Sequence, residues 1–273
     1  MKAHLKQLLA AGGWHLLRLG GRKPDAPRVS VAMYHTVGSA SISGMSLDPG
    51  IFDAQLSQLR SLFAEILTIG QLSRKAAPTD WTACVTFDDG FVDNYEIALP
   101  LLKRHGIPAT FFACSGFIDG EHDITSRFLH YRGLRPMSWS QVRELSAEGM
   151  EIGAHTHSHP NLARLPPHKQ REEMHRSQCI IEDKIGAPVG SFAIPFGGRG
   201  TYTAETLAIA GRLFSACCTT HYGTNPPDGL RANGMLLLSR VQPMPRDSLD
   251  LFFRKMTGRW DAMRWIQRTQ RTP

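Results

Sequence analysis

Residues Thr82–Gly90 read TACVTFDDG, a β-branched and apolar run that ends in two aspartates and a glycine. A short run of this composition is typical of a buried strand. Inside a strand Asp88 and Asp89 would point to opposite faces, but before Gly90 the chain can turn and bring both into one cleft. Two carboxylates this close repel unless they share a cation, which suggests a metal site and a second, free carboxylate that acts as a base. A helix start capped by one aspartate explains the same residues equally well.

Further runs of this kind alternate with helix-period segments along the whole chain. This alternation predicts an α/β fold with parallel strands and helical crossovers. The chain has 273 residues, 42% of them hydrophobic, which fits one large domain with a sizeable core. We expect strands at Arg28–Tyr34, Glu65–Ile69, Thr82–Phe87, Ala109–Cys114, Met150–Ala154, Ser191–Ile194, Leu213–Cys217 and Leu236–Val241.

Several helices have readable boundaries. Asp48 followed by Pro49 predicts a helix start with an aspartate cap and a proline at the first helical position. Ser138, three residues before Gln141, matches a capping box. The longest helix is expected over residues 166–185.

A histidine cluster follows the predicted strand Met150–Ala154. Residues Gly153–Pro160 read GAHTHSHP, with His155, His157 and His159 in alternate positions. Imidazole is a common ligand of borderline cations, and a His-x3-His spacing on a turn places two rings within reach of one ion. The proline disfavours helical geometry at the preceding residue, so the ligands should lie on a loop. A shared strand face for all three rings, or a solvated polar loop, are the alternatives.

Asp89, His155 and His159 together would supply one carboxylate and two imidazoles. Catalytic zinc sites use such sets because they leave coordination positions open for water and substrate. The two strand ends therefore predict the metal site of a hydrolase.

At this point the chain resembles the polysaccharide deacetylase family, also known as the NodB-homology domain or carbohydrate esterase family 4. Thr86–Gly90 (TFDDG) matches the first motif of that family, and His155–His159 (HTHSH) matches the second. Ser191–Gly197 (SFAIPFG) and Val31–Val37 (VAMYHTV) are similar to the forms found in bacterial exopolysaccharide deacetylases. The resemblance covers most of the chain.

The resemblance implies a distorted, incomplete (β/α)7 barrel with a metal ion at the carboxyl ends of its strands. It implies that Asp88 is the general base and that Asp89, His155 and His159 are the metal ligands. The expected ion is Zn²⁺, with Co²⁺ or Mn²⁺ as alternatives.

The resemblance also implies how the substrate pocket is built. Thr156 and Pro195 would line it, and the backbone N–H of Phe196 would stabilise the oxyanion that forms when water attacks an acetamide.

Two parts of the family pattern are missing from this sequence. No histidine stands where the family carries its general acid, which leaves His35 and His221 as candidates, and His35 is the favoured one. The arginine that orients the catalytic aspartate in other members corresponds to Ala193. Arg231 and Arg240 are candidates to replace it, and Arg240 is also a candidate substrate contact.

We divide the chain into an amphipathic extension (1–27), the deacetylase domain (28–258) and a basic tail (259–273). Its five cysteines form no disulfide or zinc pattern, and no export signal is recognised, so we expect a cytoplasmic protein. Peripheral contact with the inner face of a membrane stays open. The net charge of +7 is spread along the chain without a nucleic-acid-binding module, so no nucleic-acid partner is expected.

The sequence thus favours an N-deacetylase that acts on an N-acetylhexosamine in a bacterial polysaccharide or its lipid-linked precursor. One alternative is hydrolysis of another non-peptide C–N bond, as in cyclic amides. The other is a catalytically silent carbohydrate-binding protein, suggested by the missing acid and arginine.

Overall fold

The computed structural model describes residues 28–38, 46–75, 78, 80–127, 131–226 and 231–261. The predicted extension (1–27) and residues 262–273 of the predicted tail lie outside them. A mostly parallel sheet forms the centre of the molecule, with its strands in the order β1-β5-β6-β7-β8-β9-β11-β10 and β4 paired to β5. The strands of this sheet are β1 (Val29–Tyr34), β4 (Glu65–Ile66), β5 (Thr82–Phe87), β6 (Thr110–Ala113), β7 (Glu151–Ala154), β8 (Ser191–Ala193), β9 (Ala216–Tyr222), β10 (Arg231–Ala232) and β11 (Met235–Arg240).

The parallel strands close into a barrel. Directly after β11, the amide of Val241 donates to the carbonyl of Val31, at 2.7 Å, and the amide of Met33 donates to the carbonyl of Val241, at 2.9 Å. These bonds join the end of β11 to β1, so that β1, β5, β6, β7, β8, β9 and β11 surround one interior. The ring is irregular, since β7 and β8 share a single pair of aligned residues, Ala154 and Phe192. The predicted distorted (β/α)7 barrel is confirmed.

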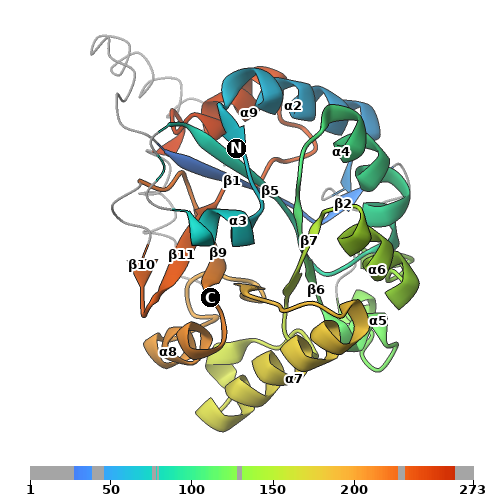
Figure 1. The fold of residues 1–273 in the computed structure, drawn as a ribbon, viewed down its shortest axis with the longest axis vertical. Coiled ribbons are helices and arrows are strands. Elements are labelled where there is room, and N and C mark those ends of the chain that lie inside the picture. Colours follow the sequence, from blue (N-terminus) through green and yellow to red (C-terminus); the bar gives the residue numbers. More distant parts are fainter. Residues whose placement is uncertain are drawn as a thin grey trace, which may run out of the picture.

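Helices surround the strands (Figure 1). A π-helical turn (Asn94–Ala98) leads into α4, and a separate two-stranded sheet is formed by β2 (Thr36–Val37) and β3 (Ser46–Leu47). The helices are α2 (Pro49–Leu62), α3 (Ile69–Arg74), α4 (Leu99–His105), α5 (Ser115–Ile118), α6 (Trp139–Ala147), α7 (Pro167–Ile185), α8 (Ala204–Leu213) and α9 (Leu249–Met256).

The predicted helix boundaries are confirmed where capping signals are strong. The carboxylate of Asp48 accepts from the amides of Gly50 and Ile51, and both halves of the capping box at Ser138 and Gln141 are present. Helix α7 ends at Gly186, which adopts the left-handed conformation with φ of 69°.

One predicted strand is too long, and another is displaced toward the amino terminus of the strand that the structure shows, β9 (Ala216–Tyr222). The strand expected at Glu65–Ile69 ends at Ile66, because Thr68 forms a capping box with Gln71 and starts α3. The strand expected at Leu213–Cys217 begins at Ala216, because α8 continues through Leu213.

Side-chain alternation along the strands sets which residues reach the barrel mouth. One buried cluster draws residues from β1, β5, β6, β8, β9 and β11, among them Cys84 and Leu238, and fills the barrel interior. Successive side chains of a strand point to opposite faces, so the inward face that includes Cys84 continues to Asp88, and that of Leu238 continues to Arg240. The intervening residues, such as Val85, pack in the outer cluster with the helices.

Strand β7 brings His155 to the same mouth, and it needs a glycine to do so. A Cβ on Gly153, two residues earlier and on the same face, would lie 2.5 Å from Cδ1 of Phe112. The glycine therefore lets the Phe112 ring fill the interior below His155.

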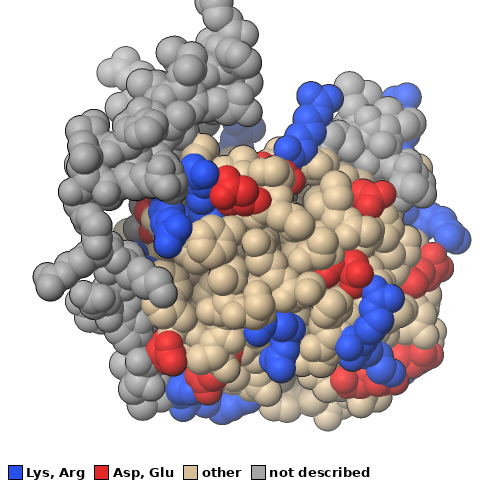
Figure 2. Space-filling view, turned by 90° about the horizontal axis from the view of Figure 1, so that it is seen from above, with Lys and Arg blue, Asp and Glu red and all other residues tan. Residues whose placement is uncertain are grey.

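The surface of the described residues carries both signs of charge. On the face shown in Figure 2, Lys and Arg lie interspersed with Asp and Glu. Within the described ranges no helix is both long and apolar enough to span a bilayer. All five cysteines are free thiols, and Cys179 is exposed while Cys84, Cys114, Cys217 and Cys218 are buried.

Candidate active site

Three predicted metal ligands meet at the barrel mouth. Oδ1 of Asp89 lies 3.5 Å from Nε2 of His155 and 3.4 Å from Nε2 of His159. All three side chains are buried, and their ligand atoms lie within 4.8 Å of one another. The fold thus brings together a carboxylate from the end of β5 and two imidazoles from the loop after β7.

The spacing of these atoms fits a bound cation. Both distances exceed the range of about 2.7–3.2 Å in which N–H donors bond oxygen. Ligand atoms about 2.1 Å from a tetrahedral zinc ion lie about 3.4 Å from one another, which is close to the spacing of Asp89 to each ring. The residues therefore fit a divalent metal of the zinc type.

The backbone around the site is held in unusual conformations. Among the described residues five non-glycine residues have positive φ, and four are predicted site residues: Asp89 (76°), Thr156 (63°), His159 (53°) and Phe196 (63°). This left-handed region costs non-glycine residues about 1–2 kcal/mol each. Such strain clusters at functional sites, where the surrounding structure holds it in place.

The buried surroundings act differently on the pKa values of the two imidazoles. Nδ1 of His155 lies 2.8 Å from the carbonyl oxygen of Ala193, which fixes the ring with Nε2 facing Asp89. Burial lowers the pKa of His155, but Asp89 and Asp88 outweigh it and raise the pKa above its ordinary value. Burial lowers the pKa of His159 to about 4, against the opposing effect of Asp89. His159 is therefore neutral at neutral pH, as a metal ligand must be.

Asp88 is held by a buried arginine. Its two carboxylate oxygens accept from Nη1 and Nη2 of Arg240 at 2.6 and 2.7 Å, a bidentate pair. Nε of Arg240 donates to the carbonyl of Thr219 at 2.9 Å, and its guanidinium lies 5.7 Å above the centre of the Phe112 ring. The side chain of Arg240 is 0% exposed and that of Asp88 is 3% exposed, so water does not screen the pair.

This pair keeps Asp88 ionised. Burial raises the pKa of the Asp88 carboxyl, but the charge of Arg240, together with His155 and the hydrogen bonds, holds the pKa below its ordinary value. Asp88 is thus a carboxylate at neutral pH, the form that can accept a proton.

Arg240 occupies the structural role left open by Ala193. Arg240 is buried and bonded to Asp88, so it is not available for the substrate contact that was also predicted for it. We infer that it positions Asp88. Arg231, the other candidate, lies on β10 and donates to the carbonyl of Ser73.

The loop after β8 forms part of the rim. Pro195 is buried, whereas the side chain of Phe196 is 41% exposed and its ring lies 4.8 Å from that of His159. Thr220 donates its hydroxyl hydrogen to the carbonyl of Phe196 at 2.6 Å, which ties the loop to β9. The structure thus places the Phe196 ring beside His159, a predicted metal ligand, and the oxyanion role of the Phe196 N–H stays a prediction.

Thr156 serves the loop in which it lies. It is fully buried, its hydroxyl donates to the carbonyl of His155, and the same oxygen accepts from the amide of His159 at 3.1 Å. These bonds span the two predicted ligands. Contact of Thr156 with substrate stays a prediction.

The two candidate acids lie in different surroundings. The charge of His35 contributes to the pKa shifts of Asp88, Asp89 and His159, which places it at the same cluster. The ring of His221 instead lies 5.9 Å from that of Tyr202. His35 therefore remains the candidate acid.

Sequence reasoning did not identify Tyr131. Its side chain is 5% exposed, and its ring lies 6.4 Å from the His35 ring and 4.8 Å from the Phe91 ring. Burial raises the pKa of Tyr131 strongly, and the nearby Asp89 raises it further. A lone tyrosine in the long segment after β6 gave no periodic or motif signal by which to find it.

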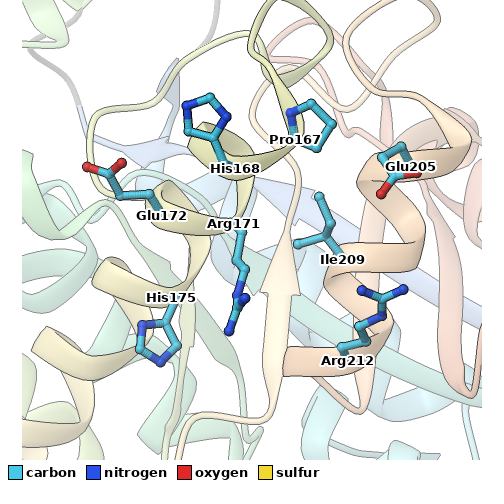
Figure 3. Close-up of a pocket in the computed structure, with 8 residues that line it drawn as sticks. All are labelled: Pro167, His168, Arg171, Glu172, His175, Glu205, Ile209 and Arg212. Atoms are coloured by element: carbon cyan, nitrogen blue, oxygen red, sulfur yellow. The ribbon is translucent and has the colours of Figure 1, made fainter.

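A separate pocket lies between α7 and α8 (Figure 3). Arg171 and His175 approach it from α7, and Ile209 and Arg212 approach it from α8. None of the predicted site residues lines it.

Replacement of a metal ligand should weaken metal binding at the triad. We expect His159→Ala to lower the affinity for Zn²⁺ by more than about 100-fold, because even residues behind a ligand contribute 10- to 100-fold. Competition of the purified protein with a chromogenic chelator measures this. His168→Ala is the matched control, since His168 is an exposed histidine of α7 outside the triad, and an equal loss from it would disprove the ligand assignment.

Known proteins resemble this chain. The model of the polysaccharide deacetylase family matches residues 75–213. The protein YxkH of Bacillus subtilis is 28% identical over 228 residues, which cover 82% of this chain and 74% of YxkH. The poly-β-1,6-N-acetyl-D-glucosamine N-deacetylase of Staphylococcus aureus is 28% identical over 177 residues, or 60% of this chain and 58% of that enzyme.

A solved structure is also similar. The deacetylase PplD of Streptococcus pyogenes, in complex with acetate, aligns with a TM-score of 0.71 at 25% identity. The alignment covers 85% of this chain and 99% of that one.

Proposed function

Because this chain belongs to the polysaccharide deacetylase family, we propose that it removes the N-acetyl group from an N-acetylhexosamine in a bacterial polysaccharide or lipid-linked glycan precursor. As a member of that family it is a hydrolase of amide C–N bonds. The proposal includes dependence on a divalent metal, with Zn²⁺ as the expected ion and Co²⁺ or Mn²⁺ as alternatives.

One observation carries the proposal. Asp88, ionised and fixed by Arg240, is adjacent in sequence to Asp89, which lies between the two imidazoles of the triad. A protein that only binds sugar needs no buried carboxylate held ready to accept a proton. A hydrolase that activates water needs both the metal set and the base.

Asp89, His155 and His159 would hold the ion. When bound, a divalent ion of this type supplies electrophilic activation of the acetamide carbonyl and lowers the pKa of water. Ala193 supports this arrangement through its carbonyl, which fixes the His155 ring.

The other residues divide the remaining chemistry. Asp88 takes the proton from the attacking water, and Arg240 holds its carboxylate in one orientation throughout. The N–H of Phe196 donates to the negative charge that develops on the carbonyl oxygen of the acetamide. His35 gives a proton to the departing amine, which leaves the free amino-sugar and acetate.

The shape of the rim supports a sugar as substrate. The Phe196 ring is exposed beside His159 and offers an apolar face on which a pyranose ring can pack. The Staphylococcus aureus relative is named for poly-β-1,6-N-acetyl-D-glucosamine, and we propose a β-linked N-acetylglucosamine polymer or its lipid-linked precursor for this chain. Action on the precursor would place the enzyme in the cytoplasm, at the inner face of the membrane.

A substrate panel tests the proposed substrate class. The full chain, loaded with Zn²⁺, is incubated with β-1,6- and β-1,4-linked N-acetylglucosamine oligomers and with a lipid-linked N-acetylhexosamine, and released acetate is measured. We expect acetate from the β-1,6 oligomers or the lipid-linked sugar in excess of the β-1,4 oligomers. Release from a cyclic amide but from none of these sugars would move the assignment to another C–N bond.

A further inference from the structure

A second cluster of potential metal ligands lies outside the triad. Glu121, His122 and His157 each present one ligand atom, and these atoms lie within 4.8 Å of one another. Two of the three come from the segment after α5, and His157 comes from the loop that also carries the triad imidazoles. The proposed function uses none of these side chains.

His157 is oriented as metal-bound histidines are. Its side chain is 2% exposed, and its Nδ1 lies 2.9 Å from the hydroxyl oxygen of Ser115. Its Nε2 faces the carboxylate of Glu121, with Oε2 at 3.0 Å. A polar partner on one ring nitrogen fixes the ring and leaves the other nitrogen as the ligand atom.

His122 completes the set through a close approach over a glycine. Its ring lies 5.1 Å from the His157 ring, with the planes at 87°. A Cβ on Gly116 would lie 2.6 Å from Cδ2 of His122, 2.6 Å from the backbone oxygen of His157 and 3.0 Å from Cε1 of His157. A glycine at this position therefore admits both rings as well as the close approach of the His157 backbone.

We propose that Glu121, His122 and His157 form a second divalent-cation site, with the two-imidazole and one-carboxylate donor set that suits Zn²⁺. In tetrahedral ligation the ligand atoms lie about 3.4 Å from one another. The ligand atoms of this cluster lie within 4.8 Å of one another, so some of them must move closer to bind an ion. Glu121 has a half-exposed side chain and His122 is partly exposed, so both can make this adjustment while His157 stays in place. The proposal does not depend on the deacetylase reaction.

A surface arginine makes this site weaker than the triad. Nη2 of Arg176, from α7, lies 2.9 Å from Oε2 of Glu121, the same oxygen that faces His157. A cation at the cluster must compete with this guanidinium for the carboxylate. The half-exposed Arg176 can swing away into water, at the cost of a surface ion pair.

A cation at this site would link residues 115–127 to the loop that carries His155 and His159. The carbonyl of His157 accepts from the amide of Gly116, and Nη1 of Arg127 donates to the carbonyl of Ser158 at 3.0 Å. A cation held by Glu121, His122 and His157 would add a further link between residues 115–127 and the loop that supplies His155 and His159.

Equilibrium dialysis tests the proposal. The metal-free full chain is dialysed against stepped, buffered free Zn²⁺ concentrations, and bound zinc is measured by mass spectrometry. We expect two binding steps in the natural sequence. His122→Ala should lose only the weaker step and His159→Ala only the tighter one, so that the two sites are separated whatever the enzyme activity.

Two further variants complete the test. Arg176→Gln should tighten the weaker binding step by about two- to fivefold, since an exposed ion pair contributes up to about 1 kcal/mol. If His122→Ala does not fold, this variant tests the proposed site in its place. His168→Ala removes an exposed histidine of α7 and should leave both steps intact. A single step in the natural sequence, both steps in His122→Ala, no tightening in Arg176→Gln, or loss of the weaker step in His168→Ala would each overturn the proposal.

Discussion

Asp88→Asn should lower kcat by about 10²- to 10⁴-fold, the contribution expected of a general base. The amide has nearly the shape of the carboxylate but cannot take the proton of the attacking water. Its carbonyl oxygen can still accept one of the two hydrogen bonds from Arg240. Initial rates of acetate release at saturating substrate measure the effect.

Metal content and stability are the controls for this variant. Zinc per chain should stay close to that of the natural sequence, because Asp89 and the two histidines are unchanged. The variant leaves the Arg240 charge buried without its counter-ion, which lowers stability. Urea unfolding therefore checks that the variant is still folded. Undiminished kcat would remove Asp88 from the reaction, and loss of bound zinc would show that the roles of Asp88 and Asp89 are reversed.

Arg240→Gln should have the largest effect on stability, about 3–5 kcal/mol, because it leaves a buried carboxylate without its cation. It should also move the acidic limb of the kcat/KM profile to higher pH. The base must be ionised to act, and Arg240 holds the pKa of Asp88 below its ordinary value against the raising effect of burial. Without the arginine, burial raises the pKa of Asp88. The base is then protonated, and activity lost, at a higher pH than in the natural sequence.

Arg231→Gln is the matched control for this prediction. Arg231 is an arginine of the neighbouring strand β10, and its contact is with the carbonyl of Ser73 instead of Asp88. It should leave the acidic limb unmoved. An unshifted limb in Arg240→Gln, or an equal shift in both variants, would show that Arg240 does not set the ionisation of Asp88. The shift separates a positioning role from a purely structural one.

Much of this site was predictable because strand ends carry its residues. The run Thr82–Phe87 is strand β5 with the predicted bounds, and the aspartates follow it directly. The histidine motif likewise follows β7. Since parallel strands end at the same side of a barrel, the order of motifs was enough to predict that Asp89, His155 and His159 would meet.

The choice between Arg231 and Arg240 required the three-dimensional structure. Both lie near the predicted last strand, and only the register of β11 with β9 and the closure at Val241 turn Arg240 toward Asp88. The second cluster was equally hidden, because Glu121 and His122 lie in an irregular segment without periodicity. Helix α3 was missed although Thr68 and Gln71 form a capping box, since the apolar residues around them matched a strand.

The most direct test of the central claim is acetate release by chelated enzyme, with and without added metal. The full chain is freed of metal, assayed on β-1,6-linked N-acetylglucosamine oligomers and on a lipid-linked N-acetylhexosamine, and assayed again after one equivalent of Zn²⁺, Co²⁺ or Mn²⁺ is added. We predict that acetate release disappears on chelation and returns with metal, and that metal restores none in His159→Ala. Equal acetate release before and after chelation, or none from either substrate with zinc bound at the triad, would contradict a metal-dependent N-deacetylase.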